Sequence, residues 1–509
     1  MPRRAVAVLG PALPAAVVAW VVAAASLVPH HALTGVHGYD GHGYDDGVYL
    51  GAAVRLLHGQ LPYLDQDLLH PPGVVWLGLP FAALGELAGG SAALAAARVL
   101  TVLVAGVNVL LAGAAVRSAG RLAVFVTAGL LALTPASYAA TQTFLLEPYA
   151  ACCGLAALAV LGTRAGDVAP RGRVLLAGGL LGLAVAFKLF GVLVVLGVVL
   201  GLLPRWRQML HCCLGVVAGF ALPTLPLAVL DPSRFVHDVV VAQLGRADRG
   251  RGPGLHDRLS VVLGLDTVAA PSDRGAWVLA ALVAVTLAGL TVQVVRRRLS
   301  RMHVVVVVVG AAVFTGMAQQ PQFFDHYAYV VAAFVVLPVG WGAAALVDAA
   351  GLRWLSAAVA VAVAVVAAAC LLVPGAVTRS ADYTRASADP AALIRHYVPS
   401  GSCVVTDVPT MLLVADRLDG PRSCDVPLDP FGTWFTEDDL SPPGSPPPYE
   451  EGFVEDWLGW FQTADYAVLS VEHSNYVPWS PELQGWFDRH YVLVGSGPRT
   501  YVYYRVPGD

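Results

Sequence analysis

The sequence predicts a polytopic α-helical membrane protein with about 11 transmembrane helices and a C-terminal extracytoplasmic α/β domain. Three observations support this fold class. Of the 509 residues, 57% are hydrophobic and only 13% are charged, which departs from the balance of a soluble domain. The hydrophobic residues form long runs separated by short loops that carry arginines. From about residue 379 the composition becomes that of a soluble chain.

The first apolar run, Ala5–Val28, follows Arg3 and Arg4. It is too long for a signal-peptide core and ends without a small-residue cleavage site, so we expect a retained span with a cytoplasmic N-terminus. The later runs are Ala93–Val116, Leu122–Pro135, Pro148–Leu161, Val174–Phe187, Leu189–Leu203, Met209–Leu230, Trp277–Val295, His303–Met317, Tyr329–Leu346 and Leu352–Val373. Several are shorter than the ~20 residues that a span requires, so their ends are approximate.

Arginines in the short loops indicate the orientation, because cytoplasmic loops are enriched in basic residues. Those expected in the cytoplasm are Arg117, Arg121, Arg164, Arg171, Arg173, Arg205, Arg207, Arg296, Arg297, Arg298, Arg301 and Arg353. Counting Pro72–Leu87 as a span would place Arg117 and Arg121 outside. We therefore interpret this short, proline-containing segment as a re-entrant or interfacial helix. The result is eleven spans in the plasma membrane, with the C-terminus outside.

The chain is thus expected to consist of a transmembrane module, residues 1–378, and a soluble α/β domain, residues 379–509. The first outer loop, residues 29–92, includes the interfacial helices. In the soluble domain the patterns predict a helix, two buried strands and a hairpin. These are Ala391–Tyr397, then Cys403–Thr406 and Tyr466–Ser470, then Tyr491–Gly495 with Tyr501–Val506; Ser441–Tyr449 is a proline-rich loop. Cys403 and Cys424 share this region, but their spacing does not decide whether they form a disulfide.

The segment Tyr39–Gly73 of the first outer loop is rich in carboxylates and aromatic rings. Asp45 and Asp46 begin a stretch with apolar residues at helical spacing, which we expect to lie in the membrane interface. Helix N-capping explains one Asp. It leaves the second, together with Asp40, Asp65 and Asp67, unexplained. A carboxylate at a helix N-terminus is suited to act as a general base towards a hydroxyl.

His70 precedes Pro71 and Pro72, and the prolines are explained by helix initiation. His70 is not. A metal held by His70 with Asp65 or Asp67 matches no recognised ligand spacing, so a divalent metal is left as an open alternative.

Further polar residues are expected on the same outer face. Glu147 precedes Pro148 at a span start, which fits either helix capping or a second carboxylate role. Lys188 is the only Lys in the chain and lies within apolar sequence, which marks a functional residue unless its side chain merely reaches the interface. Arg98 has the same two explanations. An anionic ligand would account for both cations.

The loop Asp231–Ala276 is rich in arginine, which opposes the positive-inside trend. Arg246 is one of these residues. Either a phosphate-bearing ligand or anionic lipid headgroups would explain them. His326 and Tyr327 lie at another outer span start, where an aromatic belt predicts the tyrosine but not the histidine.

The order of these motifs resembles the first outer loop and following spans of GT-C superfamily glycosyltransferases, particularly protein O-mannosyltransferases and the lipid A aminoarabinose transferase. The matching residues are Tyr44-Asp45-Asp46-Gly47-Val48-Tyr49, Gly59 with Pro62-Tyr63, His70-Pro71-Pro72-Gly73, Arg98, Leu146-Glu147-Pro148, Gly182-Leu183-Ala184 with Lys188, and His326-Tyr327. The likeness covers roughly the first 350 residues, and its motifs are specific only in combination.

The resemblance implies a sugar donor linked to polyprenyl phosphate and a catalytic acidic residue in the first loop. It assigns the base to Asp45, with Asp46 adjacent. The residues implied for the donor phosphate are Arg98, Lys188, Arg246, His326 and Tyr327, and those for site organisation are Glu147, His70, Tyr49 and Tyr63. Mannosyltransferases often have Lys soon after the His-Pro-Pro segment, whereas Val74 and Val75 follow here, so another cation would have to substitute.

The predicted reaction is therefore inverting transfer of a sugar to a hydroxyl of a cell-envelope glycan, lipid or protein on the extracytoplasmic side. A secondary transporter is a second reading, but it predicts charges near span midpoints and paired broken helices. A non-catalytic membrane protein that binds cell-envelope glycan is a third. The net charge of −4 gives no indication of a nucleic-acid partner, and membrane lipids are expected to surround the spans.

Overall fold

The computed structural model describes most of the chain. The described residues are 10, 12–26, 33–36, 42–162, 169–203, 205–244, 259–260, 262–263, 273–320, 323–351, 389–421, 423–434, 451–474 and 476–507. Among them, five helices are long and apolar enough to cross a membrane. They are α5 (Gly90–Ala115), α11 (Trp206–Ala228), α15 (Asp273–Val295), α16 (Arg301–Ala318) and α17 (Ala328–Ala349).

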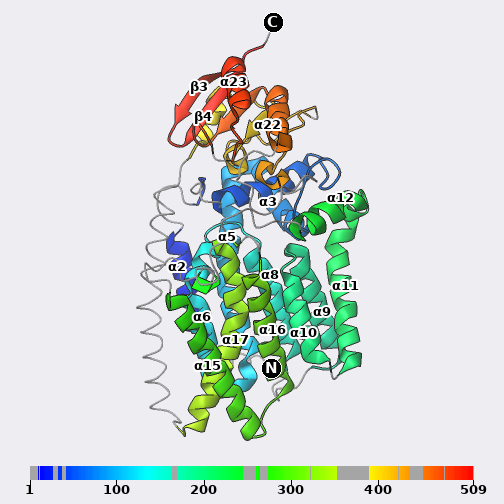
Figure 1. The fold of residues 1–509 in the computed structure, drawn as a ribbon, viewed down its shortest axis with the longest axis vertical. Helices are drawn as coiled ribbons and strands as arrows, with labels where there is room; N and C mark the ends of the chain where they lie inside the picture. Colours follow the sequence, from blue (N-terminus) through cyan, green and yellow to red (C-terminus); the bar gives the residue numbers. More distant parts are fainter. Residues whose placement is uncertain are drawn as a thin grey trace.

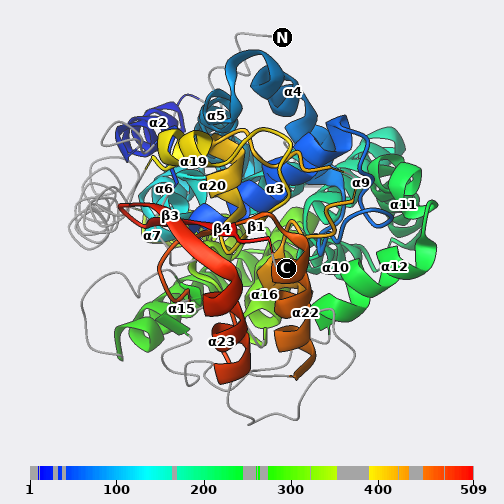
Figure 2. The same cartoon turned by 90° about the horizontal axis from the view of Figure 1, so that it is seen from above.

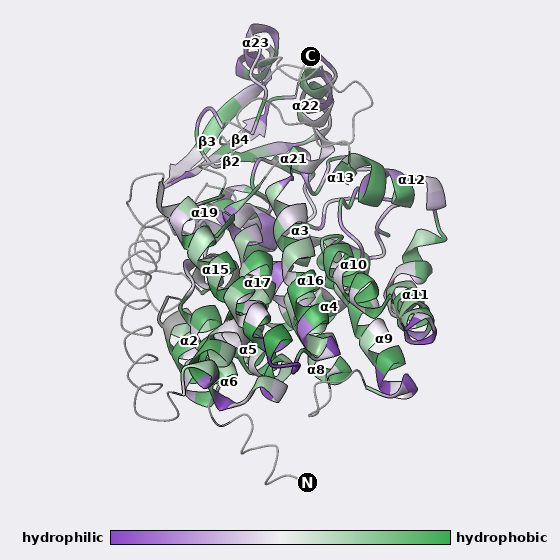
Figure 3. Cartoon of the chain, turned by 60° about the horizontal axis from the view of Figure 1, so that its bottom comes forward, coloured by the Kyte–Doolittle hydropathy of each residue, from purple (hydrophilic) through white to green (hydrophobic). Residues whose placement is uncertain are grey.

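Shorter helices complete a bundle whose members run roughly along the long axis of the molecule (Figure 1). They are α2 (Leu13–Ser26), α6 (Arg121–Leu133), α8 (Glu147–Leu161), α9 (Arg171–Phe187) and α10 (Gly191–Leu202). Hydrophobic residues dominate the bundle, and hydrophilic ones gather at helix ends (Figure 3). Each apolar run predicted between residues 93 and 346 coincides with one helix. The run Leu352–Val373 lies outside the described residues.

Two short helices lie at one end of the bundle and pack against each other: α3 (His42–Leu57) and α4 (Gly73–Ala88). The sequence predicted that α3 begins at Asp45. It begins three residues earlier, so Asp45 is the last residue of the first turn, Asp46 follows it, and neither residue precedes the helix. Pro72 precedes α4, which fits helix initiation by proline.

The C-terminal part forms a four-stranded sheet in the order β1-β2-β4-β3. The strands are β1 (Val404–Thr406), β2 (Tyr466–Leu469), β3 (Tyr491–Gly497) and β4 (Thr500–Arg505), with β1 parallel to β2 and the other pairs antiparallel. Helices α19 (Ala391–Tyr397), α20 (Pro409–Val414), α21 (Pro430–Thr433), α22 (Glu451–Thr463) and α23 (Pro481–His490) accompany it. The predicted helix, both strands and the hairpin are confirmed. Cys403 and Cys424 form a disulfide, which the spacing had left undecided.

The sheet separates two hydrophobic cores, because successive side chains of a strand point to opposite faces. Val404, Val468 and Val502 belong to a core that also contains residues of α3, α4 and α5. Val405 and Ala467 belong to a second core, shared with α22 and α23. The first core therefore fixes the sheet against the end of the helix bundle, and α20 lies over α3 when the molecule is seen from above (Figure 2).

Candidate active site

Asp46, directly after the first turn of α3, is fully buried and paired with Arg98 of α5. One carboxylate oxygen accepts hydrogen bonds from Arg98 Nε at 3.2 Å and Nη2 at 2.5 Å. The other accepts the backbone N–H of Phe144 at 2.5 Å. Arg98 also donates to the carbonyl oxygens of Leu33 and Gly35. This pair ties α3, α5 and the segment before α8 together.

Asp45 is placed differently, because its side chain keeps 24% of its surface exposed. His326 Nε2 lies 3.8 Å from Asp45 Oδ2 and 3.7 Å from Glu147 Oε1. His326 itself is 4% exposed and belongs to the 3-10 helix η3 (Asp325–Tyr327). The imidazole therefore stands between two carboxylates that are about a hundred residues apart in sequence.

Lys188 joins the same cluster from the break between α9 and α10. Its ammonium group donates a hydrogen bond to Glu147 Oε1, and both side chains are buried. The ammonium also lies 4.2 Å from the centre of the Tyr327 ring, within the range of a cation–π contact. Five residues that the sequence singled out, Asp45, Glu147, Lys188, His326 and Tyr327, are thus brought together from α3, α8, the α9–α10 break and η3.

The environment of Asp45 changes its acidity. Burial raises the pKa of its carboxyl group, Lys188 lowers it, and the carboxylates of Glu147 and Asp429 raise it again, so that it stands at about 8. An acid with a pKa near the working pH is the most effective proton acceptor, since it is both available and basic. Perturbed acids of this kind are concentrated at functional sites.

Three further predicted residues form a neighbouring group. Tyr49, one α3 turn after Asp45, places its hydroxyl 3.3 Å from His70 Nε2. Tyr63 donates its hydroxyl hydrogen to the His70 carbonyl oxygen at 2.6 Å. The first contact fastens the segment before α4 to α3, and the second braces that segment internally. Among the described residues, no three His, Cys, Asp or Glu side chains are arranged to hold a metal ion.

Arg246 lies outside the described residues. The preceding part of its loop, α12 (Pro232–Val236), contains Arg234, whose guanidinium donates to Asp67 of the first loop. Asp67 is therefore engaged in an ion pair between two loops. Asp65 accepts the backbone N–H of Leu61 at 2.7 Å and so stabilises a local turn.

The sequence did not indicate the contacts that the C-terminal part makes with α3. Tyr44 donates its hydroxyl hydrogen to Asp429 at 2.6 Å, and Thr410 donates to the carbonyl oxygen of Gly43. A Cβ atom at Gly47 would lie 2.1 Å from the Thr410 backbone nitrogen. Glycine is therefore required where α20 crosses α3. Asp429 precedes Pro430 as a typical helix N-cap, and only the fold reveals its reach to Tyr44.

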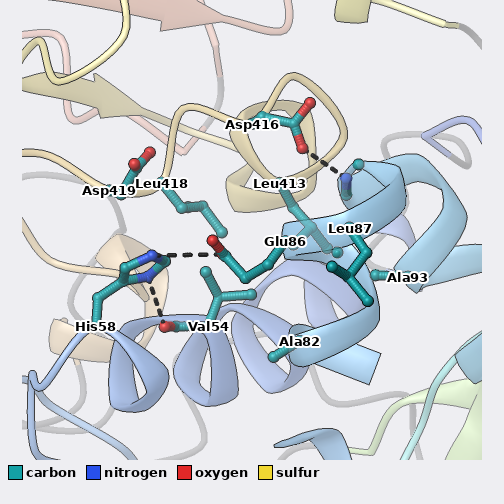
Figure 4. A pocket seen from close by; sticks show the side chains of 13 residues that line it. Val54, His58, Ala82, Glu86, Leu87, Ala93, Leu413, Asp416, Leu418 and Asp419 are labelled. Carbon is teal, nitrogen blue, oxygen red and sulfur yellow. Dashed lines mark hydrogen bonds and ion pairs between the residues drawn. The ribbon is translucent and has the colours of Figure 1, made fainter. Parts of the chain in front are cut away.

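A pocket of about 290 Å³ opens on the other end of α3. Figure 4 shows His58, the residue after α3, and Glu86 of α4 in contact at its wall, 3.4 Å apart, with Asp416 bonded to the start of α5. Val54, which lines it, is nine residues from Asp45, or roughly 14 Å along the helix at about 1.5 Å per residue. The pocket is thus separate from the Asp45 cluster.

Comparisons with known proteins indicate the protein family and the fold. Residues 68–321 match the model of glycosyltransferase family 87. The match covers α4 to α16, and therefore Arg98, Glu147 and Lys188. No curated protein is significantly similar to the chain in sequence.

The fold is shared with solved glycosyltransferases. ArnT from Cupriavidus metallidurans, in a crystal structure bound to undecaprenyl phosphate, is 18% identical with a TM-score of 0.59, over 96% of this chain and 97% of that one. The oligosaccharyltransferase of Archaeoglobus fulgidus, tethered to an acceptor peptide, is 14% identical with a TM-score of 0.56, over 97% and 74%. AglB from the same organism, with an inhibitory peptide and a dolichol-phosphate, is 14% identical with a TM-score of 0.52, over 91% and 69%.

The family match is to enzymes, and the fold is shared with enzymes. These findings favour a glycosyltransferase over a secondary transporter or a non-catalytic glycan-binding protein. The family match, the fold and the apolar helices together identify the chain as a multi-pass membrane glycosyltransferase with the GT-C fold.

Proposed function

We propose that this enzyme transfers a sugar from a polyprenyl-phosphate donor to a hydroxyl group of a cell-envelope glycan, lipid or protein, with inversion at the anomeric carbon. The observation that carries the proposal is the placement of Asp45. Its carboxylate is partly exposed beside His326, Glu147 and Lys188, whereas the adjacent Asp46 is committed to Arg98.

In the proposed reaction the acceptor oxygen attacks the anomeric carbon while Asp45 takes its proton. The bond between that carbon and the phosphate oxygen breaks, and polyprenyl phosphate leaves. Lys188 and His326 stabilise the charge that develops on the phosphate. A single displacement inverts the anomeric centre, since only one carboxylate acts, and it acts on the acceptor.

The donor class is inferred from the related folds and from the cations. ArnT was solved with undecaprenyl phosphate and AglB with a dolichol-phosphate. Lys188 supplies a buried positive charge, and Tyr327 holds it in place. Arg246 stays a predicted phosphate ligand. We assign Arg98 to positioning Asp46, because its guanidinium donates to that carboxylate and to two backbone carbonyls.

Glu147 and the Tyr49, Tyr63 and His70 group are assigned to site organisation. Glu147 contacts both Lys188 and His326, and the hydrogen bonds of Tyr49 and Tyr63 hold the His70 segment in place. No step of the reaction is assigned to a metal ion.

The site is proposed to face away from the cytoplasm, with the N-terminus inside, eleven spans in residues 1–378 and residues 379–509 as an extracytoplasmic domain. The loop arginines support this orientation. The Cys403–Cys424 disulfide agrees with it, because disulfides persist in oxidising compartments.

Cysteine labelling tests the orientation. Leu64, exposed in the first loop, and Arg207, exposed at the start of α11, are replaced by Cys one at a time. A membrane-impermeant maleimide is expected to label Leu64→Cys in intact cells and Arg207→Cys only after permeabilisation. The opposite pattern would invert the proposed topology.

The activity itself is tested with purified protein and a panel of undecaprenyl-phosphate sugars. We expect release of undecaprenyl phosphate from at least one member, by transfer or by hydrolysis. Failure to release it from every member, in protein that is folded and binds the lipid phosphate, would overturn the donor assignment.

A further inference from the structure

A buried turn between α7 (Pro135–Thr141) and α8 carries polar groups that the proposed reaction does not use. Gln142 is 1% exposed and Thr143 is fully buried. Neither atom of the Gln142 amide, nor the Thr143 hydroxyl, has a hydrogen-bond partner among the described residues. The same holds for Glu147 Oε2, although Glu147 Oε1 is bonded to Lys188.

Both ends of this turn are fixed at the candidate active site. Phe144, which follows Thr143, donates its backbone N–H to Asp46, next to Asp45. Glu147 begins α8 and lies 3.7 Å from His326. Helix α7 packs against η3, the element that carries His326. The turn that carries the unpartnered groups therefore lies between Asp46, Glu147 and η3, the elements that frame the candidate site.

Buried polar groups without partners are costly. Leaving a buried donor or acceptor unsatisfied costs about 1–3 kcal/mol, and the large majority of buried polar groups in native proteins are hydrogen-bonded. Three such side chains in six residues are thus unusual, and buried polar groups that persist unpaired mark strained or functional positions.

The chemistry of the three side chains restricts the ligand. An amide both donates and accepts hydrogen bonds, a hydroxyl does the same, and a carboxylate oxygen accepts. Hydroxyl groups match all three. A phosphate does not, because it only accepts and would be repelled by Glu147. Neighbouring hydroxyls on a rigid ring would satisfy these groups together.

We propose that Gln142, Thr143 and Glu147 Oε2 bind hydroxyl groups of the sugar that is transferred, and so determine which sugar the enzyme accepts. This inference rests on the proposed function and adds the residues that recognise the sugar hydroxyl groups. Sites built to hydrogen-bond a hydroxyl discriminate strongly against substrates that lack it, since the buried protein group is then left unpaired.

The test replaces the two side chains by apolar ones of similar shape. Gln142→Leu and Thr143→Val remove the hydrogen-bonding groups and keep the volume. Thr141→Val is the matched control, because Thr141, the last residue of α7, is similarly buried but its hydroxyl donates to the Ser137 carbonyl oxygen of its own helix at 2.5 Å. The substrates are undecaprenyl-phosphate mannose, glucose and galactose, which differ in single hydroxyl orientations, and bare undecaprenyl phosphate.

We expect Gln142→Leu and Thr143→Val to lower kcat/KM for the preferred sugar by at least about 10-fold, the cost of an unmade buried hydrogen bond, and to narrow the preference among the three sugars. Binding of bare undecaprenyl phosphate and the unfolding temperature without donor should not fall. Thr141→Val should behave as wild type in all four measurements.

Two results would overturn the inference while leaving the proposed function standing. One is wild-type kcat/KM and sugar preference in both variants, as a water-filled site would give. The other is a lower unfolding temperature with equal loss of sugar-linked and bare lipid binding, as a packing role would give. If the wild-type enzyme uses none of the sugar-linked lipids, the proposed function is contradicted, and this inference falls with it.

Discussion

Asp45 and Asp46 are neighbours in the chain, but successive side chains of an α-helix point about 100° apart. One therefore faces Arg98 in the core and the other faces His326. The sequence could predict that a carboxylate of this pair matters, because one capping residue does not explain two acids. It could not choose between them, since the choice depends on which residues of α5 and η3 lie opposite.

The acidity of Asp45 predicts how the reaction depends on pH. A general base must be ionised, and the pKa of Asp45 stands at about 8. We therefore expect kcat/KM to rise about tenfold per pH unit below pH 8 and to level off above it. A pH profile measured in detergent or nanodiscs checks this. A rate that is flat between pH 6 and 9 would contradict the assignment.

A second substitution tests the cause of that acidity. The Asp429 carboxylate raises the pKa of Asp45, so Asp429→Asn should move the inflection of the profile to lower pH. Asparagine keeps an oxygen that can accept the Tyr44 hydroxyl hydrogen. An unchanged inflection in a folded variant would show that Asp429 does not act on the base.

Asp46 should behave as a structural residue. Asp46→Asn leaves the buried Arg98 guanidinium without its countercharge, which typically costs about 3–5 kcal/mol. We expect a clearly lower unfolding temperature, measured by thermal denaturation of the purified protein. Asp45→Asn is the matched control and should unfold near the wild-type temperature. Equal destabilisation by both substitutions would contradict a structural role that is specific to Asp46.

At the scale of elements, the sequence was most informative for the apolar helices and the strands. Backbone groups within a membrane must be hydrogen-bonded internally, so a long apolar run is expected to form a helix. It was least informative for α20, which has only six residues, Pro409–Val414. Its contact with Gly47 joins residues far apart in the chain and leaves no periodic pattern.

That contact gives a prediction for the crossing of α3 and α20. Gly47→Ala places a Cβ where the Thr410 backbone already lies, so the two helices must separate and Asp45 must move. We expect a marked loss of transfer activity together with a lower unfolding temperature. Gly129→Ala in α6 is the control, because a Cβ there meets no atom within 4 Å. Normal activity of Gly47→Ala would show that α3 and α20 can move apart at this crossing without disturbing the proposed site.

At the scale of the whole molecule, the C-terminal sheet is docked against the proposed active site. It shares a hydrophobic core with α3, α4 and α5, and Asp429 and Thr410 contact the first turns of α3. The composition change near residue 379 predicted a soluble unit. It could not predict that this unit would hold the helix that carries Asp45.

The disulfide contributes to that arrangement. Cys403 and Cys424 close a loop that contains α20. Replacing both by Ser should reduce stability by about 2–4 kcal/mol, the usual contribution of a native disulfide, and should lower activity because α20 positions α3. Thermal unfolding and transfer assays check this. Wild-type activity in the double variant would show that the disulfide is not needed to position α3.

The most direct measurement compares wild type and Asp45→Asn with an undecaprenyl-phosphate sugar that the wild type uses, recording donor binding and sugar transfer on the same preparations. Asn has nearly the same shape but cannot take the proton. The account predicts donor affinity close to that of wild type and transfer lowered by about 10²–10⁴-fold, the usual contribution of a general base. Transfer at the wild-type rate by Asp45→Asn would contradict it.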